Sequence, residues 1–202
     1  VHYTGQMFYN CSNLTTLDVS NFKMSNAYST WGMFEGCEKV TKLDVSNWDM
    51  SKDKKISWMF KNCKSLRSLD VSNWDTSHVN ATEEFYTDSY LGDAAGIFSG
   101  CSSLVSLDLH KWDSSGFINV QEMFRECSSL TSLNLTGWNP KYSTSYYMLF
   151  SECTNLTSVD TSLWTGTSAT NTDYMFYDCE KLTKIDLGKF NASNVTSSDA
   201  MF

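Results

Sequence analysis

Aspartate recurs at one position along nearly the whole chain, and a regular row of carboxylates can bind cations or accept hydrogen bonds from a ligand. The row comprises Asp18, Asp44, Asp70, Asp108, Asp160 and Asp186, with Asn134 in the remaining place. Most members lie between two apolar residues, so they should point outward if those neighbours point inward. Two such charges ~5 Å apart repel by ~1 kcal/mol in water. We expect a row that is solvated or capped by nearby hydroxyls and amides, that contacts a protein or glycan, or that holds divalent cations.

A dedicated metal site is not indicated by this spacing. Calcium loops gather about six to eight oxygen ligands in a dense cluster, and the sequence contains no D-x-D-x-D run. Structural zinc sites use close-set cysteine pairs such as C-x-x-C, which are also absent. We therefore predict no metal and no cofactor.

The cysteines also keep one phase, and thiols in a row could form disulfides. They are Cys11, Cys37, Cys63, Cys101, Cys127, Cys153 and Cys179, with steps of 26, 26, 38, 26, 26 and 26 residues. In a stack, neighbours would lie roughly 4.7–4.9 Å apart with parallel Cβ vectors, which disfavours bridging. An odd number also leaves one thiol over. We predict a ladder of buried free thiols, with one or two disulfides as the alternative.

Catalytic chemistry has little support. The three histidines are His2, His78 and His110, and no G-x-S-x-G, glycine-rich phosphate loop or H-E-x-x-H motif occurs. His110 takes a place held by serine in other repeats, which is typical of a solvated turn residue. The sequence predicts a protein that is not an enzyme.

The aspartates and cysteines belong to a longer repeat. A phenylalanine three places before each cysteine and an aromatic residue eleven places after it follow the same steps, including one insertion of 12 residues. A fixed period between about 20 and 50 residues is the signature of a solenoid. The second aromatic series, which includes Trp48, Trp74, Trp112, Trp138 and Trp164, is interpreted as core rather than as a stacking platform for sugars.

Within one repeat the apolar spacing changes from helical to alternating. Ile56, Met59, Phe60 and Cys63 fall at i, i+3, i+4 and i+7, which predicts one face of a short helix. The segment 69–71 alternates inward and outward, as a half-buried strand does. One helix, one turn and one strand per repeat give an α/β solenoid of about seven 26-residue repeats.

The repeat reads C-x-x-L-x-x-L-D-V-x-x-W, followed by a polar stretch and M-F, and LDVSNWD occurs intact at 43–49 and 69–75. It resembles the leucine-rich repeats of BspA-like bacterial surface proteins, in their 26-residue variant. The resemblance implies a right-handed leucine-rich-repeat solenoid, an extracellular cell-surface location and a role in adhesion or recognition without catalysis. It leaves the ligand open.

The insertion lies within residues 80–96 and has helix signals of its own. Asn80 followed by Glu83 reads as a capping box, and Gly92 is a plausible stop. Insertions in repeat proteins often mark a binding face. The segment is predicted either to fold back on the stack or to form a contact loop. Its candidate binding residues are Glu83, Glu84, Phe85, Tyr86, Tyr90 and Leu91.

Bulk composition narrows the partners. The net charge of −8 argues against nucleic acid and anionic membranes, and no run of 18 apolar residues could insert in a bilayer. Residues 1–202 are expected to form a single solenoid that starts and stops within a repeat and lacks end caps, as a fragment of a longer surface protein would. We predict non-covalent binding of a protein or glycan, including ligands from a host. The alternative is a structural spacer or self-associating stalk with no ligand site of its own.

Overall fold

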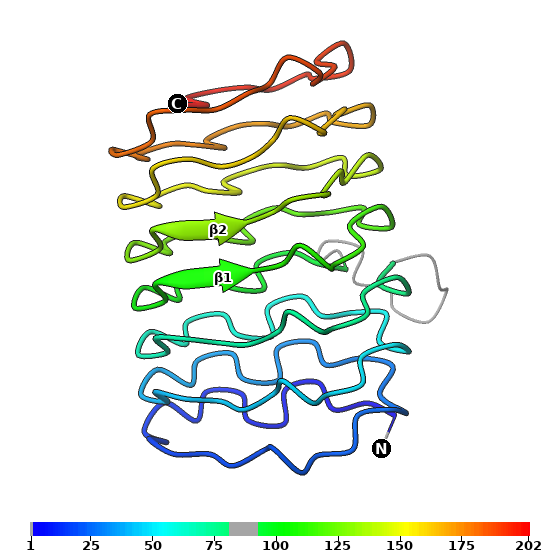
Figure 1. The fold of residues 1–202 in the computed structure, drawn as a ribbon, viewed down its shortest axis with the longest axis vertical. Helices are drawn as coiled ribbons and strands as arrows, with labels where there is room; N and C mark the ends of the chain where they lie inside the picture. Colours follow the sequence, from blue (N-terminus) through cyan, green and yellow to red (C-terminus); the bar gives the residue numbers. More distant parts are fainter. Residues whose placement is uncertain (1, 81–92) are drawn as a thin grey trace.

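The computed structural model describes residues 2–80 and 93–202, which wind into a stack of flattened coils (Figure 1). Within these residues two segments are regular strands, β1 (Ser106–Asp108) and β2 (Ser132–Asn134). They pair in parallel, with Leu107 opposite Leu133. Both strands are short because the chain turns again two residues later, at 110–111 and 136–137. A coil here means the chain from one residue to its equivalent in the next repeat.

The other coils follow the same path with sparser strand pairing. An isolated parallel bridge joins Ser158 to Lys184, in phase with Ser106 and Ser132, and another joins Tyr3 to Ser29 at the other side of the coil, where the residues before each cysteine begin. The outward side of residues 15–20 and of the equivalent residues in the other coils is called the strand face below. The residues that precede each cysteine, such as 55–62, are called the turn segments.

Each turn segment is a run of tight turns whose amides point alternately within the coil and along the stack. In the segment before Cys63, the Met59 amide donates to the Ile56 carbonyl at 3.3 Å, whereas the Trp58 amide donates to Ala95 of the next coil at 2.9 Å. The same alternation recurs in the coils on either side. The turn segments therefore join neighbouring coils by backbone hydrogen bonds, as the strands do.

The predicted helix at 56–63 is wrong, and no helix occurs in the described part of the chain. Trp58 and Asn62 have φ values of 57° and 59°, in the left-handed region, which a right-handed helix cannot contain. The apolar spacing is nevertheless obeyed, because Ile56, Met59 and Phe60 are fully buried. Consecutive turns thus bury the same positions as a helix would, so the α/β assignment fails while the inward-facing residues are correct.

Stacked aromatic rings fill the core between the two sides of each coil. Phe60 lies parallel to Phe34, with ring centroids 5.6 Å apart, and to Phe98 at 5.9 Å. Trp74 is 1% exposed, and its indole Nε1 donates to the Val45 carbonyl at 3.1 Å. Equivalent bonds are made by Trp48, Trp112 and Trp138. These contacts confirm the tryptophan series as core.

The cysteines are free thiols, as predicted. The five from Cys37 to Cys153 are buried, and those at the two ends of the series are half-buried. Burial raises the pKa of the Cys37 thiol to about 11 and that of Cys101 to about 12. Each thiol behaves as a small apolar residue with one weak donor.

The stack keeps its register across the insertion. The Phe60 amide donates to the Ile97 carbonyl at 2.9 Å, a separation of 37 residues where the neighbouring coils show 25. The chain rejoins the stack at Asp93, which is fully buried and accepts the amides of Ile118 and Asn119 at 3.0 and 3.2 Å. The candidate binding residues Glu83, Glu84, Phe85, Tyr86, Tyr90 and Leu91 lie outside the described residues.

Candidate recognition groove on the strand face

Each aspartate of the row is fixed by its own turn. Oδ1 of Asp18 accepts hydrogen bonds from the Ser20 amide at 3.0 Å and from the Ser20 hydroxyl at 2.7 Å. Asp70 makes the same pair of bonds with Ser72, at 3.1 and 2.8 Å. These are the local turns that an Asp side chain forms with the backbone two residues on. The capping predicted for the row is therefore present in the structure.

The second carboxylate oxygen is left for other partners. All six aspartates of the row are exposed. Among the described residues, no hydrogen bond reaches Oδ2 of these carboxylates, since every contact uses Oδ1. The Ser20 hydroxyl and amide hold the pKa of Asp18 below its usual value, and the His110 side chain does the same for Asp108. The strand face thus presents a row of exposed carboxylate oxygens that can accept hydrogen bonds.

One position of the row breaks the repulsion between neighbours. Asn134 stands where the other coils have aspartate, and its Nδ2 donates to Asp108 Oδ1 at 2.9 Å. Asn134 also keeps the local turn, because its Oδ1 accepts the Thr136 amide at 3.1 Å. An amide therefore replaces the carboxylate here without changing the backbone.

Three connected hollows run along this face. Their volumes are about 320, 300 and 390 Å³. Lys42 and Asp44 line both the first and the second hollow, and Asp70 lines both the second and the third. The hollows therefore form one groove across five coils, from Thr15 to Asn134.

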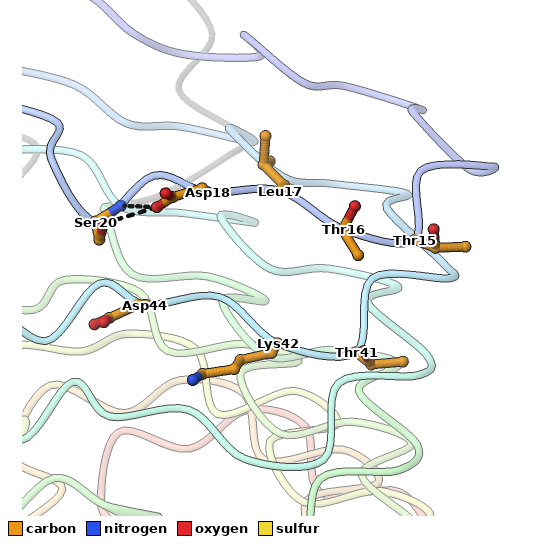
Figure 2. A pocket seen from close by; sticks show the side chains of 8 residues that line it. All are labelled: Thr15, Thr16, Leu17, Asp18, Ser20, Thr41, Lys42 and Asp44. Carbon is orange, nitrogen blue, oxygen red and sulfur yellow. Dashed lines mark hydrogen bonds between the residues drawn. The ribbon is translucent and has the colours of Figure 1, made fainter.

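The first hollow shows how the groove is built. Asp18 and Asp44 lie on successive coils at one end of it, and Thr15 and Thr41 lie at the other (Figure 2). Its lining also includes the half-buried Leu17. The carboxylates and hydroxyls of this lining can accept hydrogen bonds from hydroxyl, amide or ammonium groups. A long, shallow groove suits an elongated ligand better than a compact one, which enclosed pockets hold.

The structure places the candidate residues in two categories. Asp18, Asp44, Asp70 and Asp108 line the groove, and Asp160 and Asp186 continue the same row in the coils beyond it.

Within residues 2–80 and 93–202, no group of three His, Cys, Asp or Glu side chains could hold a metal ion. The same residues contain no helix that is long and apolar enough to cross a membrane.

Sequence reasoning missed two buried carboxylates. Asp53 and Asp93 are both fully buried. Asp53 follows Trp48 by five residues, a place that Val79 and Phe117 take in other coils. For Asp53, a charged residue in an apolar position of the repeat was the available signal.

The sequence matches a family model described as "Mycoplasma protein of unknown function, DUF285" over residues 1–91 and 92–202. The chain belongs to this family. No curated protein matches this DUF285 chain.

Solved structures place this DUF285 chain among leucine-rich repeat proteins. It is similar to the T. pallidum leucine-rich repeat protein TpLRR, with a TM-score of 0.52 and 19% identity over 91% of this chain and 72% of that one. A leucine-rich repeat protein from Eubacterium ventriosum gives a TM-score of 0.46 and 16% identity, over 88% of this chain and 40% of that one. A leucine rich cell surface protein from Faecalibacterium prausnitzii gives a TM-score of 0.29 and 15% identity, over 91% and 68%. The likeness to TpLRR confirms the leucine-rich repeat fold, which is the fold that the resemblance to BspA-like repeats implies.

Proposed function

We propose that this DUF285 chain is an extracellular recognition module of a cell surface, which binds an elongated protein or glycan ligand along the strand face. The observation that carries the proposal is the continuous groove lined by a row of fixed carboxylates. Each carboxylate is oriented by its own turn before any ligand arrives, so little side-chain freedom is lost on binding. The BspA-like repeat supports the extracellular location and a role without catalysis.

The finer architecture belongs to the same proposal. A right-handed solenoid of about seven repeats would present the groove as one uninterrupted surface, since equivalent residues repeat at each coil. The inserted residues, with Phe85, Tyr86 and Tyr90, would add a second contact to a ligand held on the strand face.

A mutant that removes charge from the groove tests the proposal. The variant Asp44→Asn, Asp70→Asn, Asp108→Asn keeps every oxygen that caps a turn, and Asn134 shows that the coil accepts asparagine there. The wild type and this variant are compared on a panel of host matrix proteins and glycans. The matched control is Asp49→Asn, Asp75→Asn, Asp113→Asn, which removes three charges from exposed residues outside the groove and keeps the oxygens that cap their turns.

Binding that the groove variant loses by about tenfold or more, and the control retains, supports the proposal. Equal binding by all three proteins would refute the groove as the site. If no panel member binds the wild type, the result favours the alternative that the chain is a structural spacer. The stacked aromatic core is consistent with that alternative. A rod held together by ring stacking and backbone bonds between coils needs no ligand to keep its shape.

A further inference from the structure

The turn segments carry left-handed residues at two fixed positions, and the side chains chosen there differ between coils. The segments at 29–36 and 93–100 use glycine at both, for instance Gly96 and Gly100 with φ of 57° and 72°. Glycine adopts this conformation without strain, whereas other residues do so at a cost. The glycine coils therefore show which residue the backbone itself prefers.

Segments 3–10 and 55–62 also lack glycine at these positions, but the three consecutive segments 119–126, 145–152 and 171–178 are the ones that place acids there. Their left-handed residues are Glu122, Glu126, Met148, Glu152, Tyr174 and Asp178, with φ between 52° and 63°. Strained residues that persist in a repeat commonly mark a functional surface. Because the fold accepts glycine at these positions, the large and charged side chains there need another reason.

Three tyrosines form a cluster on this surface. The ring of Tyr174 is perpendicular to that of Tyr147, with centroids 6.2 Å apart and an interplanar angle of 87°. It is also perpendicular to Tyr177, at 5.6 Å and 80°. Tyr177 is 45% exposed. Perpendicular rings present π faces in different directions, which is the arrangement that holds a cationic side chain.

The charge around the tyrosines is negative. The three turn segments contain five acids and one base, and the acids are Glu122, Glu126, Glu152, Asp173 and Asp178. Arg125 pairs with Glu126 at 2.8 Å, and it lies 3.9 Å from Glu152. Asp173 is occupied by the Ser197 hydroxyl at 2.6 Å. Arg125 therefore serves carboxylates of two successive coils, and among the described residues it makes no ion pair with the acids of segment 171–178.

The fold does not dictate this charge. The turn segment 55–62 has the same backbone but carries Lys55 and Lys61 and no acid. Their ammonium groups lie 5.6 Å from the Trp31 ring and 4.7 Å from the Trp58 ring. One solenoid thus presents cations over aromatic rings in an early coil and acids beside aromatic rings in later ones.

We propose that turn segments 119–126, 145–152 and 171–178 form a docking surface for a basic polypeptide segment, rich in lysine or arginine. The tyrosines pack against its cationic side chains, and Glu126, Glu152 and Asp178 pair with their charges. An extended segment laid along the stack meets one carboxylate of this series per coil. The surface is independent of the strand-face groove, so either can be present without the other.

Binding of a nona-arginine peptide, measured by calorimetry at about 150 mM salt, tests this surface. The variant Glu126→Gln, Glu152→Gln, Asp178→Asn should lose about tenfold in affinity, since charge-assisted bonds are lost. The control variant Asp49→Asn, Asp75→Asn, Asp113→Asn removes the same charge from exposed residues outside both the groove and the turn segments, and it should bind within about twofold of the wild type. A nona-citrulline peptide should not bind. Equal weakening by both variants would show diffuse attraction only and would overturn the proposal, as would a wild type that does not bind.

The contribution of the tyrosines to peptide binding can be tested with a variant whose folding is checked separately. Tyr174→Gly relieves a left-handed residue, and Gly96 shows that glycine fits the equivalent place. The variant should unfold at a temperature no lower than the wild type and bind nona-arginine at least about threefold more weakly. Unchanged affinity in the folded variant would remove the tyrosine cluster from the docking surface.

Discussion

The Cys63 thiol donates a hydrogen bond to the carbonyl oxygen of Phe34, at an Sγ–O distance of 3.3 Å, and so links two consecutive coils. The same bond joins Cys101 to Phe60 across the insertion at 3.1 Å. A buried thiol that is held in this way has neither the exposure nor the ionisation that reactivity requires.

We therefore expect the buried thiols to be unreactive in the folded protein. At pH 8, a thiol-specific reagent should leave the five buried cysteines unmodified, because burial raises the pKa of Cys101 to about 12. In denaturant without a reducing agent, all seven should react. Rapid modification of five or more in the native protein would contradict the buried ladder, and a denatured count below seven would reveal disulfides.

Stability should decline as the pH rises from mildly acidic to neutral. Burial raises the pKa of Asp53 to about 7 and that of Asp93 to about 6, from a usual value of 3.8. Between pH 3.8 and these values the folded state holds protons that the unfolded state has lost, so the free energy of unfolding falls with increasing pH across this window. Urea unfolding at several pH values measures the slope.

Asp53→Asn is the matched variant for this effect. Oδ1 of Asp53 accepts the Lys55 amide at 3.0 Å, a bond that asparagine can keep, while Oδ2 has no hydrogen-bond partner among the described residues. The variant should be more stable than the wild type at pH 8, and its stability should depend less on pH. If the variant is less stable at pH 8 and its unfolding free energy has the same dependence on pH as that of the wild type, the buried Asp53 carboxylate is not the cause of the destabilisation.

The leucines under the groove should contribute to stability of the whole stack. Leu69 is 8% exposed, and Leu69→Ala should lower the free energy of unfolding by ~2–5 kcal/mol because it leaves a cavity. Leu163 is 46% exposed, and Leu163→Ala should change it by no more than ~0.5 kcal/mol. Chemical denaturation of both variants distinguishes them; equal effects would mean that the inward positions are misassigned.

Alanine substitutions at two glycines with positive φ distinguish the destabilisation caused by backbone strain from that caused by steric crowding. At Gly100 (φ 72°) a Cβ would lie 2.3 Å from Asn62 Oδ1, while at Gly137 (φ 88°) its nearest neighbour would be the His110 carbonyl at 3.9 Å. Gly137→Ala should therefore cost about 1–2 kcal/mol from strain alone. Gly100→Ala should lower the stability further, because Asn62 must also move. Thermal unfolding of the two variants measures the difference. Equal losses would show that Asn62 yields freely.

Much of the fold follows from residue spacing. The repeat places Phe60, Cys63, Leu69 and Trp74 in the core, and each is buried. The absence of a helix at 56–63 was not predictable from periodicity, because consecutive turns bury the same positions. The informative signal was the recurrence of Gly or Asn four residues apart, as in Gly96 and Gly100, which favours left-handed backbone rather than helix.

The site was predictable to a similar extent. The D-x-S pattern of Asp18 and Ser20 gives both the outward direction and the turn that fixes the carboxylate. The groove itself was not foreseen, because its continuity depends on how closely coils stack. The tyrosine cluster was also missed, since Tyr147 and Tyr174 lie in different repeats and outside the regular ladders.

The most direct test of the central claim is to locate a bound ligand on the folded chain. Backbone amide chemical shifts are followed by NMR while the tightest-binding panel member is titrated. We expect the shifts to concentrate at residues 15–20, 41–46, 68–72 and 106–110, and to vanish in the Asp44→Asn, Asp70→Asn, Asp108→Asn variant. Shifts confined to other residues, with none along the strand face, would contradict binding in the groove.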